Sequence, residues 1–191
     1  MAYHKKIIDA IHPYGDQLIC SLANICESLI RFPKAADLHI KSLSHPDDWT
    51  TQIAPQQNSL LHQIQTLRLQ HGDDPYLRAS CLSMELILYL SCPYPGMDLT
   101  STAGELRDAL SALPVRYCLF MDLVSCQLML GAVAANEGSE VREWFVARIR
   151  RAVTTLRSRG WERPLEVLEK GFVSDNGLVA RFRELWREVD S

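Results

Sequence analysis

The apolar positions of the chain recur with the period of an α-helix. Between residues 16 and 32, the side chains of Leu18, Leu22 and Ile25 are spaced three or four residues apart, which places them on one helical face. Pro33 ends this stretch, because a proline inside a helix removes a backbone donor and clashes with the preceding turn. The pattern therefore predicts an amphipathic helix close to the N-terminus.

Further helices are expected in later stretches, which are separated by proline, glycine or capping residues. They cover residues 34–43, 59–70, 75–91, 102–113, 115–136, 140–158, 162–170 and 178–189. Residues 44–58 read as a loop because they hold two prolines and several polar residues. Thr102 and Glu105 have the spacing of a capping box, and Ser139 is placed to cap the helix that follows it.

No stretch shows a sustained alternation of apolar and polar residues bounded by hairpin turns, so no sheet is expected. The predicted fold is all-α, a single helical domain over residues 1–191. We expect an orthogonal bundle of about eight helices around the apolar helix at 115–136. That helix is almost long enough to cross a bilayer, but Asp122 and Gln127 interrupt it, which favours a core helix. We therefore predict no contact with membranes.

The composition is that of an ordinary globular protein, with 47% hydrophobic residues, 23% charged residues and a net charge of −3. A weakly acidic chain lacks the clustered positive charge that holds nucleic acid, so direct nucleic-acid binding is not expected. The first residues contain no apolar run that resembles a signal peptide. An intracellular, cytoplasmic location is therefore predicted.

The six cysteines include no CxxC pair, and most lie within apolar helical runs, so we expect free thiols rather than a zinc site. His39 and His45 lie near Asp47 and Asp48 and could imitate a metal cluster. Because these residues fall in the predicted loop, they are read as solvated polar side chains. No metal and no cofactor are predicted.

Pieces that contain tryptophan stand near the C-terminus in a recognisable order. Arg142–Ile149 holds Trp144, an Arg-Gly-Trp sequence ends at Trp161, and a final piece holds Trp186. The apolar stretch 130–135, which ends in small residues, comes just before them. Over about residues 115–190 the chain resembles the C-terminal end of the fungal-specific transcription factor domain. That domain is the helical regulatory region of fungal zinc-cluster (Zn2Cys6) regulators, and the resemblance implies that the three tryptophans belong to the core.

The chain departs from these regulators at its N-terminus. It has no basic six-cysteine cluster and no heptad stretch, and it starts directly in the helical region. It is therefore either a fragment of a regulator or a stand-alone product that kept the helical scaffold. The start at Met1 and the helix close to Ser191 lead us to expect the second.

The candidate chemical groups are polar residues within apolar helices, because the chain contains no GxSxG, P-loop, GxGxxG or HExxH sequence. Glu85 and Asp122 are the predicted catalytic residues, since burial raises the pKa of a carboxyl and suits it to acid–base work. The predicted substrate-binding residues, which share helical faces with them or adjoin them, are Tyr89, Arg78, Met121 and Ser125. The alternative is that each carboxylate caps a helix or pairs with an arginine.

Three functions follow as hypotheses. The first is a stand-alone protein that binds a hydrophobic small molecule in fungal specialised metabolism. Such a protein could be a cofactor-independent cyclase or isomerase that acts on an aromatic polyketide or a prenylated phenol. The second is the effector domain of a transcription regulator, which would place the chain in the nucleus. The third is a protein-interaction module derived from such a regulator, and formation of a homodimer is left open.

Overall fold

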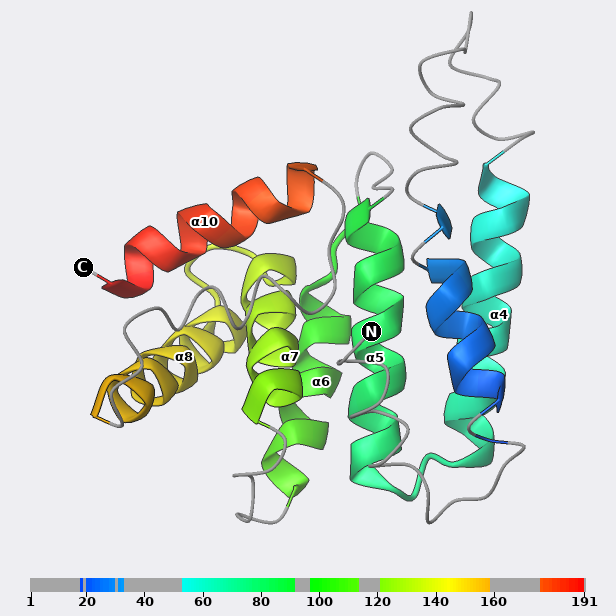
Figure 1. The fold of residues 1–191 in the computed structure, drawn as a ribbon, viewed down its shortest axis with the longest axis horizontal. Helices are drawn as coiled ribbons and strands as arrows, with labels where there is room; N and C mark the ends of the chain where they lie inside the picture. Colours follow the sequence, from blue (N-terminus) through cyan, green and yellow to red (C-terminus); the bar gives the residue numbers. More distant parts are fainter. Residues whose placement is uncertain are drawn as a thin grey trace, which may run out of the picture. The chain divides into compact units, whose positions relative to one another are not determined.

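The described residues form helices joined by turns and short irregular segments (Figure 1). The computed structural model describes residues 18, 20–29, 31–32, 53–91, 97–113, 121–158 and 176–190. For residues 121–125, 156–158, 176–177, 179 and 190 it describes the backbone alone. These residues contain no strand, which confirms the predicted all-α class. The chain divides into two compact units, Met1–Ile64 and Gln65–Ser191. The single domain and the orthogonal arrangement of the helices stay predictions.

Helices with defined bounds follow one another along the chain. They are α4 (Ala54–Gln70), α5 (Pro75–Ser91), α6 (Thr100–Ala112), α7 (Met121–Ala134), α8 (Glu140–Ser158) and α10 (Asn176–Asp190). A further helical segment lies within residues 18–32. The expected helices at 34–43 and 162–170, and the expected first residues of the central helix, lie outside the described residues. None of the described helices has the length and hydrophobicity needed to cross a bilayer.

In the unit Met1–Ile64, the expected stripe of apolar residues is buried. Leu18, Leu22, Ile25 and Leu29 of that stripe are buried, and Cys26 is partly buried. Phe32, at the end of the segment, is buried as well. The start of α4 was expected to be a loop, and that expectation is wrong for residues 54–58. Pro55 is accepted there because the first turn of a helix has no use for a backbone donor at that position. Some of the polar residues that favoured a loop, such as Gln56, are exposed on this helix. The N–H of Gln57 donates to the Ile53 carbonyl at 3.0 Å, which is a bond of the helical type.

In the unit Gln65–Ser191, α7 occupies the central position expected of it. It packs against α5, α6, α8 and α10. The stretch 126–132 is buried on all sides. Residues 81–88 of α5 are buried as completely, so two helices rather than one form the centre of this core.

Gly131 lets α7 approach α8 closely. A Cβ atom at this position would lie 2.2 Å from Cζ of Phe145, which is 0% exposed. Carbon atoms in contact are normally about 3.5–4.0 Å apart. The ring of Phe145 therefore occupies the space that any larger residue at position 131 would need.

Polar side chains accept backbone N–H groups at the starts of α5, α6 and α8. At α6 this side chain is not the one expected. Asp74 accepts hydrogen bonds from the N–H groups of Tyr76 and Leu77 at 2.8 and 3.1 Å, with Pro75 in the first turn of α5. Ser139 Oγ accepts the Arg142 N–H at 3.2 Å, which confirms its predicted role.

The capping box predicted at Thr102 and Glu105 is wrong. The helix already begins at Thr100, and its N-cap residue, Leu99, makes no side-chain capping bond. Asp98 instead accepts the Thr100 N–H at 2.8 Å. Thr102 therefore lies inside the helix, where its side chain is not at a capping position.

The described tryptophans lie at the border of the core. Trp144 and Trp186 are partly buried and pack against core residues. The ring of Trp144 meets Phe145 edge to face, with centroids 5.0 Å apart, and the guanidinium of Arg148 lies 5.0 Å from the Trp144 ring. Trp161 lies outside the described residues.

Candidate functional site

Glu85 is a carboxylic acid within the buried part of α5. It is 4% exposed, and its Oε1 lies 3.5 Å from Nη1 of Arg68, a residue in the last turn of α4. Within the described part of the chain no group makes a hydrogen bond with this oxygen. Burial raises the pKa of Glu85 above its usual value, the positive charge of Arg68 lowers it, and the negative charge of Glu105 adds to the rise.

Glu85 belongs to a group of alternating charges, which we call the Glu85 ion network. Glu105 Oε2 lies 3.4 Å from Nη1 of Arg68 and 3.7 Å from Nη2 of Arg78. Arg78 was expected on the face of Glu85, but its ion pair is with Glu105 on α6. Arg68 contacts both carboxylates and so compensates part of their charge. The contact with Arg68 agrees with the alternative expectation, in which Glu85 pairs with an arginine.

The second predicted catalytic residue lies where only the backbone is described. Met121, Asp122 and Ser125 belong to the first turns of α7. Their side chains lie outside the described part of the structure. The catalytic role of Asp122 and the substrate-binding roles of Met121 and Ser125 stay predictions.

A cleft of about 440 Å³ lies in the unit Gln65–Ser191. We call it the α10 cleft. Its lining residues come from the C-terminal ends of α5 and α7, the segment before α6, the start of α8 and one side of α10. They are Tyr89, Leu90, Met97, Leu99, Ala132, Val133, Ala134, Ala135, Asn136, Glu137, Arg142, Arg181, Glu184, Leu185 and Glu188. Tyr89 is the only predicted site residue in this set, and Glu85 is not part of it.

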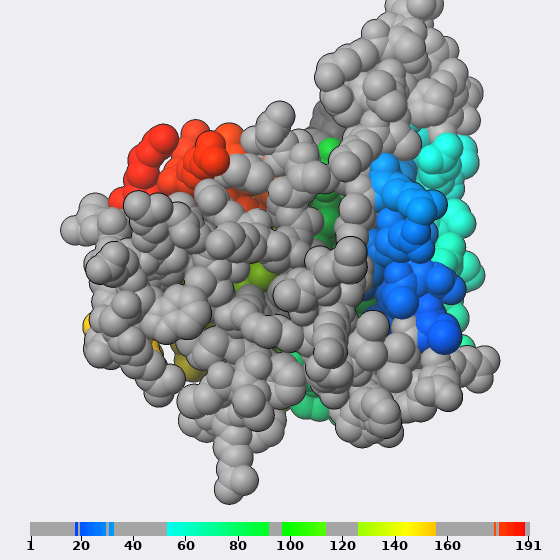
Figure 2. Space-filling model, viewed as in Figure 1, coloured from blue at the N-terminus to red at the C-terminus, as the bar shows by residue number. Residues whose placement is uncertain are grey.

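The amphipathic pattern of α10 explains how this helix forms one wall. Its buried stripe consists of Leu178, Phe182, Leu185 and Val189. These residues join the core that α7 and α8 also line. The polar residues beside the stripe, including Arg181 and Glu184, therefore fall at the edge of the cleft. Figure 2 shows α10, in red, at the surface of the molecule.

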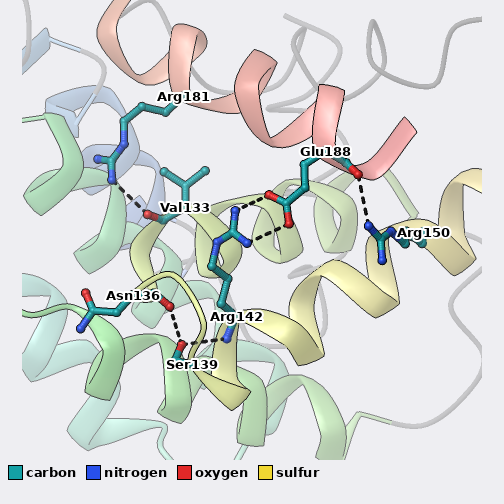
Figure 3. A network of polar contacts seen from close by, with 7 residues as sticks. All are labelled: Val133, Asn136, Ser139, Arg142, Arg150, Arg181 and Glu188. Carbon is teal, nitrogen blue, oxygen red and sulfur yellow. Dashed lines mark hydrogen bonds and ion pairs between the residues drawn. The ribbon is translucent and has the colours of Figure 1, made fainter. Parts of the chain in front are cut away.

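A bidentate ion pair joins α8 to α10 (Figure 3), and both of its residues line the cleft. Nη1 of Arg142 donates to Oε1 of Glu188 at 2.9 Å, and Nη2 donates to Oε2. These hydrogen bonds hold the pKa of Glu188 below its usual range and raise that of Arg142. Arg150 also donates to the backbone carbonyl of Glu188, at 3.2 Å.

Arg181 joins α10 to the end of α7. Its Nη2 donates to the carbonyl of Val133 at 3.0 Å (Figure 3). The last carbonyls of a helix lack partners inside the helix and carry its partial negative charge. Arg181 therefore compensates the C-terminal end of α7.

The part of the cleft lined by Leu99 and Asn136 is fixed by a second set of hydrogen bonds. The Asn136 N–H donates to Oγ1 of Thr100 at 3.0 Å, and its side-chain amide donates to Asp98 at 3.3 Å. The bonds from Thr100 and Asn136 to Asp98 lower the pKa of that carboxyl. The end of α7 and the start of α6 are thus tied together.

Sequence reasoning missed Arg142, Arg181 and Glu188 because it searched for polar residues within apolar runs. These three residues instead lie on amphipathic helices, where arginine and glutamate usually face solvent. The signal that could have found them is the strong amphipathicity of residues 176–190, since a helix with such a stripe packs on a core. The partner of each arginine could not be found in this way.

The described residues contain no group of three or more metal-ligating side chains. His39, His45, Asp47 and Asp48 lie outside them. Cys20, Cys26, Cys81 and Cys126 form no disulfide, and the last two are buried. Burial raises the pKa of Cys26 to about 11 and that of Cys126 to about 12.

Comparison with known proteins gives no relative. No protein-family model matches the chain, and neither a curated protein nor a solved structure matches it. The resemblance to the fungal-specific transcription factor domain stays a prediction.

Proposed function

We propose that the unit Gln65–Ser191 binds a small molecule in the α10 cleft, and that this ligand combines an apolar body with a polar end. The observation that carries the proposal is the cleft itself, whose volume of about 440 Å³ lies in the range of small-molecule sites, about 300–1,000 Å³. Leu99 and Val133 are partly exposed and offer apolar contact, Leu90 and Leu185 are buried behind the lining, and most of the exposed lining surface is polar.

The walls of the cleft support binding because they are already held in place. Four buried side chains anchor α10, and the bidentate pair of Arg142 with Glu188 fixes the register of α10 against α8. The hydrogen bond from Asn136 to Asp98 holds the segment before α6 against the end of α7. A site whose walls are ordered before binding avoids part of the entropic cost of ordering them around the ligand.

The geometry favours binding over catalysis. Glu85 does not line the cleft, and its charge faces Arg68. The hydrophobic ligand, the cyclase or isomerase activity and the fungal metabolic role stay hypotheses, and an effector domain would use the same cleft to sense its ligand. An enzyme and a ligand-sensing effector domain would both bind a small molecule, so binding is the function proposed.

The test compares two partly buried valines that pack against the core, Val133 and Val141, of which only Val133 lines the cleft. N-phenyl-1-naphthylamine, an uncharged apolar dye, is titrated against the wild type, Val133→Phe and Val141→Phe. Since Val133→Phe fills the cleft, we expect it to weaken binding by at least about tenfold. Val141→Phe should bind as the wild type does.

Circular dichroism and thermal unfolding establish that both variants are folded. Equal dye affinity in the wild type and in folded Val133→Phe would overturn the proposal. Native mass spectrometry of the protein from its own host then identifies a co-purified ligand by its mass.

A further inference from the structure

We infer that Arg181 anchors an anionic group of the ligand, so that the α10 cleft takes an apolar molecule bearing a single carboxylate or a comparable anion. The inference rests on the proposed function, since it names the chemistry of a ligand for the same cleft. It goes further because it assigns the polar end of that ligand and the residue that selects it.

Among the described residues, two arginines line the cleft, and their partners differ. Both terminal nitrogens of Arg142 are used by the carboxylate of Glu188, so this charge is neutralised at contact distance. Arg181 donates one hydrogen bond to a backbone carbonyl, and no carboxylate among the described residues forms an ion pair with it. A guanidinium has five N–H donors, so Arg181 keeps donors that a carboxylate can use.

The positive charge of Arg181 is compensated only in part. The C-terminal end of a helix acts as about half a negative charge, so the end of α7 compensates Arg181 only in part. Glu184, one turn along α10, also lines the cleft, but no described contact joins it to Arg181. An anion bound to Arg181 therefore meets a remaining positive charge and, one turn away, a repelling carboxylate.

A cationic ligand is the competing possibility, since Glu137 and Glu184 also line the cleft. Arg181 and both glutamates are exposed, but binding at Glu184 would first have to order a side chain that no described contact holds. The guanidinium of Arg181 is already held at the Val133 carbonyl. The preorganised group is thus the arginine, and the anion is the ligand that benefits from it.

The experiment uses two dyes that share one aromatic framework. 8-Anilinonaphthalene-1-sulfonate carries one negative charge, and N-phenyl-1-naphthylamine lacks the sulfonate. Both are titrated against the full chain of the wild type, Arg181→Gln, Arg181→Lys and Arg183→Gln. Arg183 is an exposed residue of the same helix that does not line the cleft, so its variant matches the loss of charge.

We expect Arg181→Gln to weaken binding of the sulfonate about 10- to 100-fold, the range for a hydrogen bond between charged groups. Arg181→Lys should keep part of the affinity. Arg183→Gln should leave it within about twofold of the wild type, since Arg183 does not line the cleft and solvent screens its charge from a ligand there. None of these variants should change the affinity of the uncharged dye.

Glu184→Gln decides the sign of the preferred charge. Because it removes a repelling carboxylate, it should strengthen binding of the sulfonate severalfold. The inference is overturned if Glu184→Gln weakens sulfonate binding, or if Arg181→Gln and Arg183→Gln weaken it equally. It is also overturned if the sulfonate binds no better than the uncharged dye. In each case the proposed function still stands if Val133→Phe weakens binding of the uncharged dye. Failure of this inference is therefore distinguishable from failure of the proposed function.

Discussion

Replacement of Gly131 by alanine tests the close approach of α7 and α8. The added Cβ would lie 2.2, 2.4 and 2.6 Å from three atoms of the Phe145 ring. Normal carbon–carbon contact needs about 3.5–4.0 Å, so either the ring or a helix must move by more than about 1 Å. Phe145 is fully buried and packs against Trp144, so the ring has no free space to enter.

The magnitude follows from two opposing terms. Alanine is about 1 kcal/mol more favourable than glycine inside a helix. Overpacking a core costs about 1–3 kcal/mol, and an overlap of this size belongs at the upper end of that range. Gly131→Ala should therefore lower the free energy of unfolding by about 2 kcal/mol, a decrease of roughly 4–8 °C in Tm for a chain of this length.

Gly104 is the matched control within α6. A Cβ atom there would lie 3.8 Å from Cγ2 of Val141, which is ordinary contact. Gly104→Ala should therefore raise the free energy of unfolding by about 0.5–1 kcal/mol. Urea unfolding followed by circular dichroism measures both variants. If Gly131→Ala is stabilising to the same degree as Gly104→Ala, the packing of α7 on α8 described above is incorrect.

Two further predictions concern the ionised groups. The raised pKa of Glu85 means that the folded state holds this proton more tightly, so stability due to Glu85 falls as the pH rises above 4.5. Relative to the wild type, Glu85→Gln should gain stability between pH 4.5 and neutral pH in urea unfolding, and a difference independent of pH would contradict this reasoning. The pair of Arg142 and Glu188 should show a coupling of about 1 kcal/mol in a double-mutant cycle with glutamine. The lowered pKa of Glu188 means that this coupling is present at neutral pH and is lost as the pH falls below 4.5; a cycle without coupling at neutral pH would exclude the pair as a stabilising contact.

Much of the helical arrangement could be predicted from local pattern. The helix at 75–91 was predicted to the residue, because Pro75 marks its start and the apolar run ends at Ser91. Residues 54–58 were misjudged, since proline and polar residues are as compatible with a first helical turn as with a loop. Thr102 and Glu105 matched a capping box by spacing, but Asp98 and Thr100 determine where that helix begins.

The candidate site was harder to predict than the fold. Burial of Glu85 was expected from the apolar residues around it, and the structure agrees. Two contacts depend on how helices pack. One joins Glu85 to Arg68, and the other joins Arg142 to Glu188, which is 46 residues away along the chain. The sequence contains many arginines and glutamates of similar surroundings, so local pattern does not determine which of them meet.

The rate at which the cysteine thiols react can report local opening of the folded protein. Cys126 lies within α7, where burial raises its pKa to about 12, so at neutral pH it forms the reactive thiolate to an appreciable extent only when it is exposed. Cys20, in the unit Met1–Ile64, is exposed and free in the native state. Alkylation read peptide by peptide would therefore label Cys20 at once and Cys126 only at the rate at which the core around α7 opens. The labelling rate of Cys126 then measures the local opening free energy of the unit that contains the α10 cleft, and a ligand for that cleft should slow it.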